Sequence, residues 1–178
     1  MRIFLSVILF LFTAFQSANA GGIPGALAGI LSILNLEIQG KVIRVLDGDT
    51  IEIKTLPAKI VVYEVPIRVR LINIDAPEKK QPFGRWSTSQ LKTLVAGKQV
   101  TVSYSHKDRY GRIIGHVFTT NGTDASRFMV QSGAAWVYER YNVDESLPAL
   151  QREAQEQKRG LWADANPVPP WEWRYKHN

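Results

Sequence analysis

Two neighbouring segments of the chain read RVLDGDTIEI (residues 44–53) and RVRLINIDAPE (residues 68–78). In each, a β-branched apolar run that predicts a strand meets acidic residues at a turn. Gly48 in the first turn is free to take a positive φ. If the two turns are neighbours in a small barrel, the carboxylates of four of the chain's sixteen acids converge: Asp47, Asp49, Asp75 and Glu78.

Strand-like segments continue on both sides of these turns. Alternating or β-branched residues predict strands at 41–46, 50–54, 59–65, 67–74, 99–104, 112–118 and 134–138. Apolar residues at helical spacing predict helices at 82–97, 124–131 and 147–162. This order favours an α+β, mainly β fold, namely a five-stranded OB-type Greek-key barrel with about three helices.

The composition divides the chain into four parts. They are a signal peptide (1–20), an apolar linker interrupted by Gly and Pro (21–40), the barrel domain (41–163) and a Pro- and Trp-rich tail (164–178). We expect the tail to be irregular and to lie across the domain through Trp171 and Trp173.

The first 20 residues, MRIFLSVILFLFTAFQSANA, have the features of a secretory signal peptide. Arg2 precedes an apolar stretch from Ile3 to Phe15, and the small residues of Ala18-Asn19-Ala20 suit a signal peptidase. A membrane helix needs about 20 apolar residues, more than this stretch has. We therefore expect cleavage after Ala20, export to the periplasm or medium, and no stable membrane span. An uncleaved anchor is the alternative.

Charge and cysteine content narrow the function classes. The net charge is +6 at pH 7, and it becomes +5 without the signal peptide, whose one charged residue is Arg2. This balance suits a polyanionic partner such as DNA or RNA, although charge alone does not prove one. The absence of cysteine excludes disulfides and thiol chemistry. The three histidines are scattered without His-x-x-x-His spacing, so zinc is not expected.

Asp49 and Asp75 are the candidate ligands for a divalent cation. Two close carboxylates repel one another unless a proton or cation intervenes, and Ca²⁺ or Mg²⁺ prefers oxygen ligands. Because Ca²⁺ takes about 6–8 oxygens, backbone carbonyls, waters and a substrate phosphate would complete the shell. From spacing alone, Asx-type capping of the two turns is favoured over a metal site.

Three further residues could perform chemistry near these acids. Glu78 could accept a proton from water as a general base. Arg70 and Arg112 could each grip two phosphate oxygens and stabilise charge in a transition state. Arg70 precedes Asp75 by five residues, so a straight strand would point them to opposite sides. The strand must therefore bend or end near Ile74 if both serve one site. Taken singly, each of the three is also compatible with an ordinary surface position.

Five fragments occur in a fixed order, namely VLDGDTIEI, RVRLINIDAPE, QPFG, DRYGR and QREAQEQKRGLW. Together they resemble the thermonuclease (staphylococcal nuclease-like) family over Lys41 to about Trp162. The resemblance implies an OB-barrel endonuclease that hydrolyses phosphodiester bonds of DNA or RNA with Ca²⁺, or less favourably Mg²⁺. It also implies that the 5′-oxygen leaves, which gives 3′-phosphate products. We expect the protein to be a monomer.

By motif position, the resemblance assigns the metal ligands. Asp49 and Asp75 match the metal carboxylates, and the main-chain carbonyl of Ala76 matches a third ligand. Ala76 stands where the family's type member has Thr, a change that a backbone ligand tolerates. Asp47 matches an acid that supports the turn.

The resemblance also assigns catalytic and substrate-binding roles. Glu78 matches the proposed general base, and Arg70 and Arg112 match the two arginines that clamp the phosphate. Arg109 stands where a lysine contacts phosphate, and Tyr141 matches a tyrosine that flanks the nucleotide.

Two other functions remain as alternatives. A non-catalytic nucleic-acid-binding barrel would not need a general base, and loss of a catalytic residue would have favoured it. A membrane-attached structural or partner-binding protein is suggested by the apolar character of residues 3–36.

Overall fold

The computed structural model describes residues 36–55 and 66–177. The strands are β1 (Leu36–Val45), β2 (Thr50–Thr55), β3 (Ile67–Leu71), β4 (Ile74–Asp75), β5 (Gln99–Lys107), β6 (Ile113–Thr119) and β7 (Trp136–Val137). The α-helices are α3 (Gly84–Val95), α4 (Ala125–Gln131), α5 (Leu147–Glu156) and α6 (Pro170–His177). Two short 3-10 helices complete the list, η1 (Glu139–Tyr141) and η2 (Gly160–Ala163).

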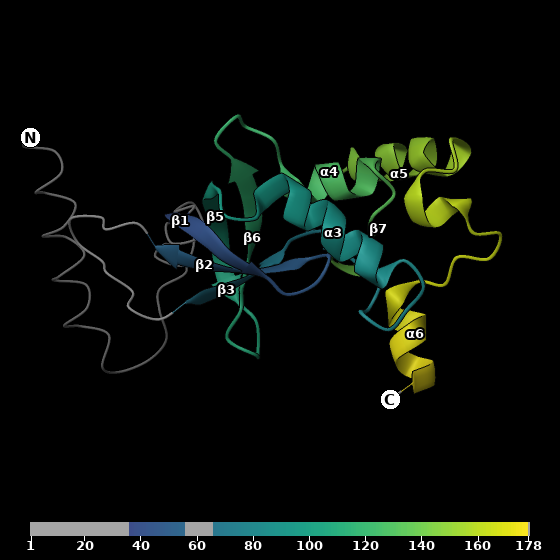
Figure 1. Ribbon diagram of the computed structural model, residues 1–178, viewed down its shortest axis with the longest axis horizontal. Helices are drawn as coiled ribbons and strands as arrows, with labels where there is room; N and C mark the ends of the chain where they lie inside the picture. Colours follow the sequence, from purple (N-terminus) through teal and green to yellow (C-terminus); the bar gives the residue numbers. More distant parts are fainter. Residues whose placement is uncertain (1–35, 56–65, 178) are drawn as a thin grey trace, which may run out of the picture. The chain divides into compact units, whose positions relative to one another are not determined.

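Five strands close into a barrel in the order β1-β2-β3-β6-β5. β3 and β6 pair in parallel, and the other described pairs of the barrel are antiparallel. The register of β1 against β2 shifts between Val42 and Arg44, a bulge of the kind that bends a strand. This bend lets β1 pair with β2 along one half and with β5 along the other. The expected five-stranded OB-type barrel is confirmed, and Figure 1 shows the helices gathered at one side of it.

Alternation along β2 and β3 separates the core from the polar face. The inward side chains are almost completely buried: Ile51, Ile53, Val69 and Leu71. The intervening residues lie on the other face, where Thr50 pairs in register with Arg70 and Glu52 with Arg68. One face of this strand pair therefore carries two arginines and one glutamate in fixed positions.

Three predicted element boundaries were wrong. β1 begins at Leu36, so residues 36–40 are strand rather than linker. The single strand predicted at 67–74 is divided into β3 and β4, because Asn73 adopts a positive φ of 70° in the turn between them. The helix predicted at 147–162 ends at Glu156, since Lys158 also has a positive φ (52°).

The prediction of an irregular tail was wrong. The tail contains a fourth α-helix, α6. Pro170 opens this helix, a position where its fixed φ fits and its missing N–H costs nothing. Glu172 lies in the first turn, and basic residues occupy the last turn, as the helix dipole favours.

Several predictions lie outside the described residues. They are the signal peptide (1–20), the linker up to residue 35 and the strand at 59–65, and they stay predictions. Within residues 36–55 and 66–177, no helix has the length and apolar character needed to cross a membrane.

Candidate active site

The first acidic turn joins β1 to β2 and is held by its own backbone. The backbone N–H groups of Leu46 and Asp47 both donate to the carbonyl of Thr50. Asp47 Oδ1 accepts from the N–H of Asp49 at 3.1 Å. Gly48 does not use its freedom to take a positive φ, but a Cβ there would collide with Ser87 and Ala76. Glycine is therefore required at this position by the close approach of α3 and the second acidic turn.

The second acidic turn brings Asp75 back toward Arg70. After β3 ends, the turn at Asn73 leads into β4, which pairs with β7 in a two-stranded sheet. Arg70 Nη2 then donates to Asp75 Oδ1 at 3.0 Å and to the carbonyl of Ile74 at 3.2 Å. β3 thus ends before Asp75, as is necessary if Arg70 and Asp75 are to meet.

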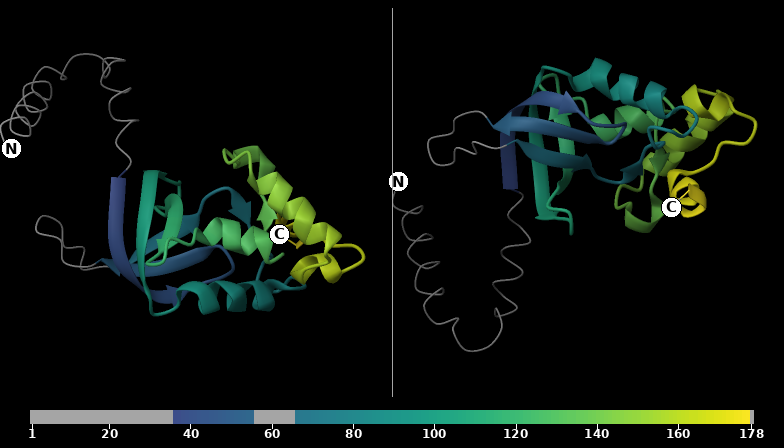
Figure 2. Two further views of the ribbon diagram at one scale, coloured as in Figure 1. Left: turned by 90° about the horizontal axis from the view of Figure 1, so that it is seen from above. Right: turned by 60° about the horizontal axis from the view of Figure 1, so that its bottom comes forward.

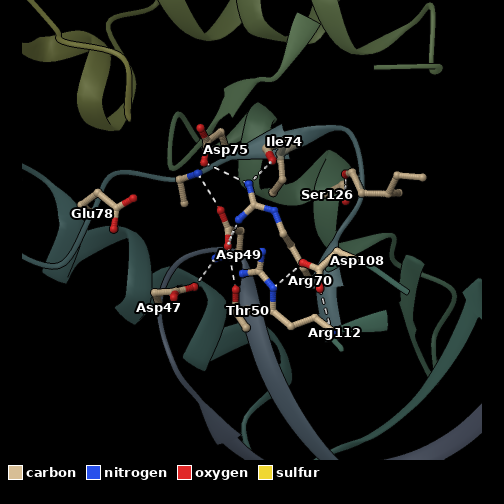
Figure 3. Close-up of polar contacts among 12 residues, drawn as sticks. Asp47, Asp49, Thr50, Arg70, Ile74, Asp75, Glu78, Asp108, Arg112 and Ser126 are labelled. Atoms are coloured by element: carbon tan, nitrogen blue, oxygen red, sulfur yellow. Dashed lines mark hydrogen bonds and ion pairs between the residues drawn. The ribbon is translucent and has the colours of Figure 1, made fainter. Parts of the chain in front are cut away.

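A single guanidinium group joins the two predicted metal carboxylates. Arg70 Nη1 donates to Asp49 Oδ1 at 2.8 Å, while its Nη2 contacts Asp75 (Figure 3). Asp49 Oδ1 also accepts from the Thr50 hydroxyl at 2.8 Å, and Asp49 Oδ2 accepts from the N–H of Ala76 at 3.0 Å. Asp49 and Asp75 therefore lie within the span of one guanidinium, although 26 residues separate them in sequence.

The cluster around Arg70 is buried, and its carboxylates outnumber its guanidinium groups. Asp49 is only 4% exposed and Asp75 only 1% exposed. Burial raises the pKa of Asp75, and the charge of Asp49 adds to this effect, against the opposing contacts of nearby arginines. Burial and the charge of Asp49 raise the pKa of Asp47 to about 6. For Arg70, burial alone would lower the pKa, but the neighbouring aspartates raise it above its usual range.

This donor set fits a hard divalent cation with open coordination positions. All the side-chain donors are carboxylate oxygens, which Ca²⁺ and Mg²⁺ prefer. In the described part of the chain, no group of three or more His, Cys, Asp or Glu side chains could hold a metal ion. Asp49 and Asp75 would thus be two ligands of a shell completed by water, backbone or substrate oxygens. The carbonyl of Ala76 stays a predicted ligand.

Glu78 is placed by the tight loop that leads into α3. Its N–H donates to Gln81 Oε1 at 3.0 Å, and the N–H of Gln81 donates back to its carbonyl at 2.8 Å. A Cβ at Gly84 would collide with the carbonyl of Glu78, so glycine is required where α3 begins. The Glu78 side chain is 42% exposed and accepts from Arg174 Nη1 at 2.8 Å.

Arg112 approaches the cluster from the turn between β5 and β6. Gly111 has a positive φ of 77°, as the tight turn predicted from DRYGR requires. Asp108 accepts from the N–H of Arg112 and from its Nε, the latter at 2.8 Å. Figure 3 shows the Arg112 guanidinium directed toward Arg70 and Asp49. In this view the Arg112 guanidinium therefore faces the part of the cluster that Arg70 and Asp49 form.

The two predicted substrate contacts lie on exposed segments. Arg109 Nη2 donates to the Tyr110 hydroxyl at 2.7 Å, and its guanidinium lies 4.8 Å from the centre of the Tyr110 ring. Tyr141 is 58% exposed and meets the ring of Tyr138 edge-on at 5.0 Å between centroids. Their roles in substrate binding stay predictions.

Sequence reasoning missed Arg174, Trp136 and Tyr138. Arg174 donates from α6 to both oxygens of Asp75, at 2.7 and 3.2 Å, as well as to Glu78. Trp136 pairs in register with Asp75, and the N–H of Tyr138 donates to the carbonyl of Asn73 at 2.8 Å. The sequence PPWEWRYKH carries a helix signal that could have revealed α6. It carries no signal for the partner of Arg174, which is 99 residues away.

The comparisons with known proteins agree with this geometry. A family model described as "Staphylococcal nuclease homologue" matches residues 68–164. An "Uncharacterized endonuclease" of Escherichia coli is 58% identical over 144 residues, which cover 81% of this chain and 90% of that protein. The "Micrococcal nuclease" of Shigella flexneri is 38% identical over 148 residues, or 78% and 81% of the two chains. With its barrel, its acidic pair and these matches, the chain belongs to the staphylococcal nuclease family.

Proposed function

We infer that this protein is a divalent-cation-dependent nuclease that hydrolyses phosphodiester bonds of DNA or RNA. The observation that carries the inference is the bridge of Arg70 between two buried carboxylates, with Glu78 and Arg112 close by. Membership of the family and relatives named as endonuclease and micrococcal nuclease support it. Ca²⁺ is the favoured ion, because it accepts irregular shells of about 6–8 oxygens where Mg²⁺ demands a regular octahedron.

Each residue has a distinct task in the proposed reaction. Arg70 and Arg112 would hold the nonbridging oxygens of the scissile phosphate and stabilise the charge that grows there. Glu78 would take a proton from the attacking water, which reaches it because the side chain is partly exposed. When bound, a divalent cation would supply positive charge beside the same phosphate. In-line attack would release the 5′-oxygen and leave a 3′-phosphate.

Incubation of the purified protein with plasmid DNA and with RNA tests this function. We expect cleavage with Ca²⁺, less with Mg²⁺ and none with excess chelator. The products should become substrates for a 3′-phosphatase. Undiminished cleavage in chelator would contradict the metal centre, and binding without cleavage would leave a non-catalytic barrel.

The first prediction concerns the general base. Glu78→Gln should lower turnover by about 100-fold, because the amide cannot accept a proton from water. Binding of DNA should change little. Glu145→Gln, which removes a carboxylate from an exposed position, is the matched control. Single-turnover cleavage and a gel-shift titration measure the two effects, and a Glu78→Gln variant as fast as the parent would remove Glu78 from the mechanism.

A further inference from the structure

The C-terminal helix α6 is anchored beside the candidate active site by aromatic rings. Trp171 stacks on Tyr138 with 5.4 Å between ring centroids and an interplanar angle of 8°. It also meets Trp136 edge-on at 5.8 Å. Because Trp136 is paired with Asp75 across the small sheet, this anchor adjoins a predicted metal ligand.

A hydrogen bond ties the segment before α6 to the loop that carries Glu78. Gln81 Nε2 donates to the carbonyl of Val168 at 2.5 Å, and Gln81 is nearly buried. The same Gln81 side chain accepts from the N–H of Glu78 through its Oε1. Figures 1 and 2 show α6 next to the loop that leads into α3. The tail is therefore held at two places, by the aromatic anchor at Trp136 and Tyr138 and by Gln81 in the loop that carries Glu78.

Arg174 projects from α6 into the acidic cluster. It follows Trp171 by three residues, so the two side chains share one face of the helix. Its Nη2 lies 2.7 Å from Asp75 Oδ2, and its Nη1 lies 3.2 Å from Asp75 Oδ1 and 2.8 Å from Glu78 Oε1. One guanidinium thus engages both oxygens of a predicted metal ligand and one oxygen of the predicted base. Such two-pronged, charge-assisted contacts are among the stronger polar interactions in proteins.

The position of Arg174 conflicts with the proposed working state of the site. A guanidinium bound to both oxygens of Asp75 occupies the electron pairs and the negative charge that a divalent cation would use. The contact of Arg174 Nη1 with Glu78 Oε1 occupies an oxygen that would otherwise be open to the attacking water. Arg70 already neutralises one charge of the Asp49–Asp75 pair, so Arg174 supplies the second positive charge of the cation-free site.

We propose that α6 is an autoinhibitory element in which Arg174 takes the place of the divalent cation. In the closed state, Arg174 holds Asp75 and Glu78, and Trp171 holds the helix on Tyr138. Binding of the cation displaces Arg174 from Asp75 and frees Glu78. This inference rests on the metal centre of the proposed function.

Calcium affinity of the full chain, measured by isothermal titration calorimetry after chelator treatment, tests the proposal. Arg174→Gln should tighten Ca²⁺ binding by about tenfold, an effect of about 1.4 kcal/mol. Trp171→Ala leaves the charge unchanged but removes the anchor, and it should tighten binding by about threefold, since the ring contacts that hold α6 in place are lost. Lys176→Gln, on an exposed residue of the same helix, removes one positive charge and should change affinity by less than about twofold.

The outcomes separate the proposal from the function on which it rests. Equal affinities of the Arg174→Gln and Lys176→Gln variants, or weaker binding by Arg174→Gln, would overturn autoinhibition and leave the metal centre intact. If Asp75→Asn binds Ca²⁺ as well as the parent, or if no variant binds it, the metal centre and the autoinhibition both fail. Circular dichroism checks that Trp171→Ala folds. If Trp171→Ala does not fold, the comparison of Arg174→Gln with Lys176→Gln decides whether α6 is autoinhibitory.

Discussion

Two acid–arginine clusters lie two residues apart on the same face of β2 and β3, and they differ in where their arginines come from. At one, Glu52 accepts from Arg44 Nε at 2.8 Å and from Arg68 Nε at 3.0 Å, so one acid has two arginines of neighbouring barrel strands. At the other, Asp49 and Asp75 share one arginine of the barrel, Arg70, and Arg174 of α6 adds the second positive charge from outside the barrel. We call these the Glu52 cluster and the Arg70 cluster.

The surroundings amplify this difference. The arginines of the Glu52 cluster are 60% and 59% exposed, and the hydrogen bond from Arg44 leads the contacts that hold the pKa of Glu52 below its usual range. In the Arg70 cluster, burial raises the pKa of Asp75. The Glu52 cluster is therefore neutralised by arginines of the barrel strands, whereas the Arg70 cluster needs a further cation, a place that Arg174 of α6 takes here. Acids and arginines form a structural site in one case and a candidate active site in the other. The ratio of acids to barrel arginines distinguishes the two sites.

The largest expected effect contrasts the two register-matched arginines. Arg70→Lys should lower cleavage with saturating Ca²⁺ by about 100-fold or more, because an ammonium group cannot make the two-pronged contact. Arg68→Lys, two residues earlier on the same face, should stay within about twofold of the parent, since its partner Glu52 lies outside the reacting cluster. Initial rates on a fluorescent single-stranded DNA measure both.

Equal losses of cleavage rate in the two variants would contradict the contrast between the clusters, because the position of Arg70 would then have no special role. The midpoint of thermal unfolding of each variant serves as the control, since a loss of activity caused by unfolding would appear there first.

The two clusters also show which features of the structure could be predicted from the sequence. Alternating and β-branched residues at 50–54 and 67–74 predicted strands, the order of strands and helices predicted the barrel, and the position of the two turns predicted the meeting of Asp49 with Asp75. The break between Arg70 and Asp75 was a geometric necessity, and Asn73 provides it. These features depend on local spacing and on a shared strand pair, and both can be read from the chain.

The contribution of α6 could not be predicted in the same way. Proline before tryptophan suggested an irregular tail, although Pro170 is well placed as the first residue of a helix. The contact of Arg174 with Asp75 joins the end of the chain to the middle, and no period or motif encodes such a pair. The role of Gly48 was not predicted either, because the close approach of Ser87 and Ala76 is a tertiary contact.

The next prediction concerns stability without a cation, where substitutions in the two clusters should change the free energy of unfolding with opposite sign. In chelator, Asp75→Asn should raise the free energy of unfolding by about 1 kcal/mol, because burial raises the pKa of this carboxyl in spite of its arginine contacts, so its ionised form costs stability at pH 7. Glu52→Gln should lower it by about 0.5–1 kcal/mol, the range for pairs with exposed partners. Urea unfolding at pH 7 measures both, and changes of the same sign would contradict the contrast.

The smallest expected effect is the pH dependence of these two changes. The pKa of Glu52 is lowered on folding, so its stabilisation exists above the unfolded value of 4.5 and disappears as the pH falls through the folded value. The pKa of Asp75 is raised on folding, so the parent loses stability relative to Asp75→Asn as the pH rises from 3.8 through the folded value. The loss caused by Glu52→Gln should therefore diminish as the pH falls below 4.5, and the gain from Asp75→Asn should vanish as the pH falls below 3.8. Urea unfolding in chelator between pH 3 and 8 follows both differences. An effect of Asp75→Asn that stays constant over this range would mean that the Arg70 cluster tolerates its excess charge without a cation. Charge balance would then no longer distinguish it from the Glu52 cluster.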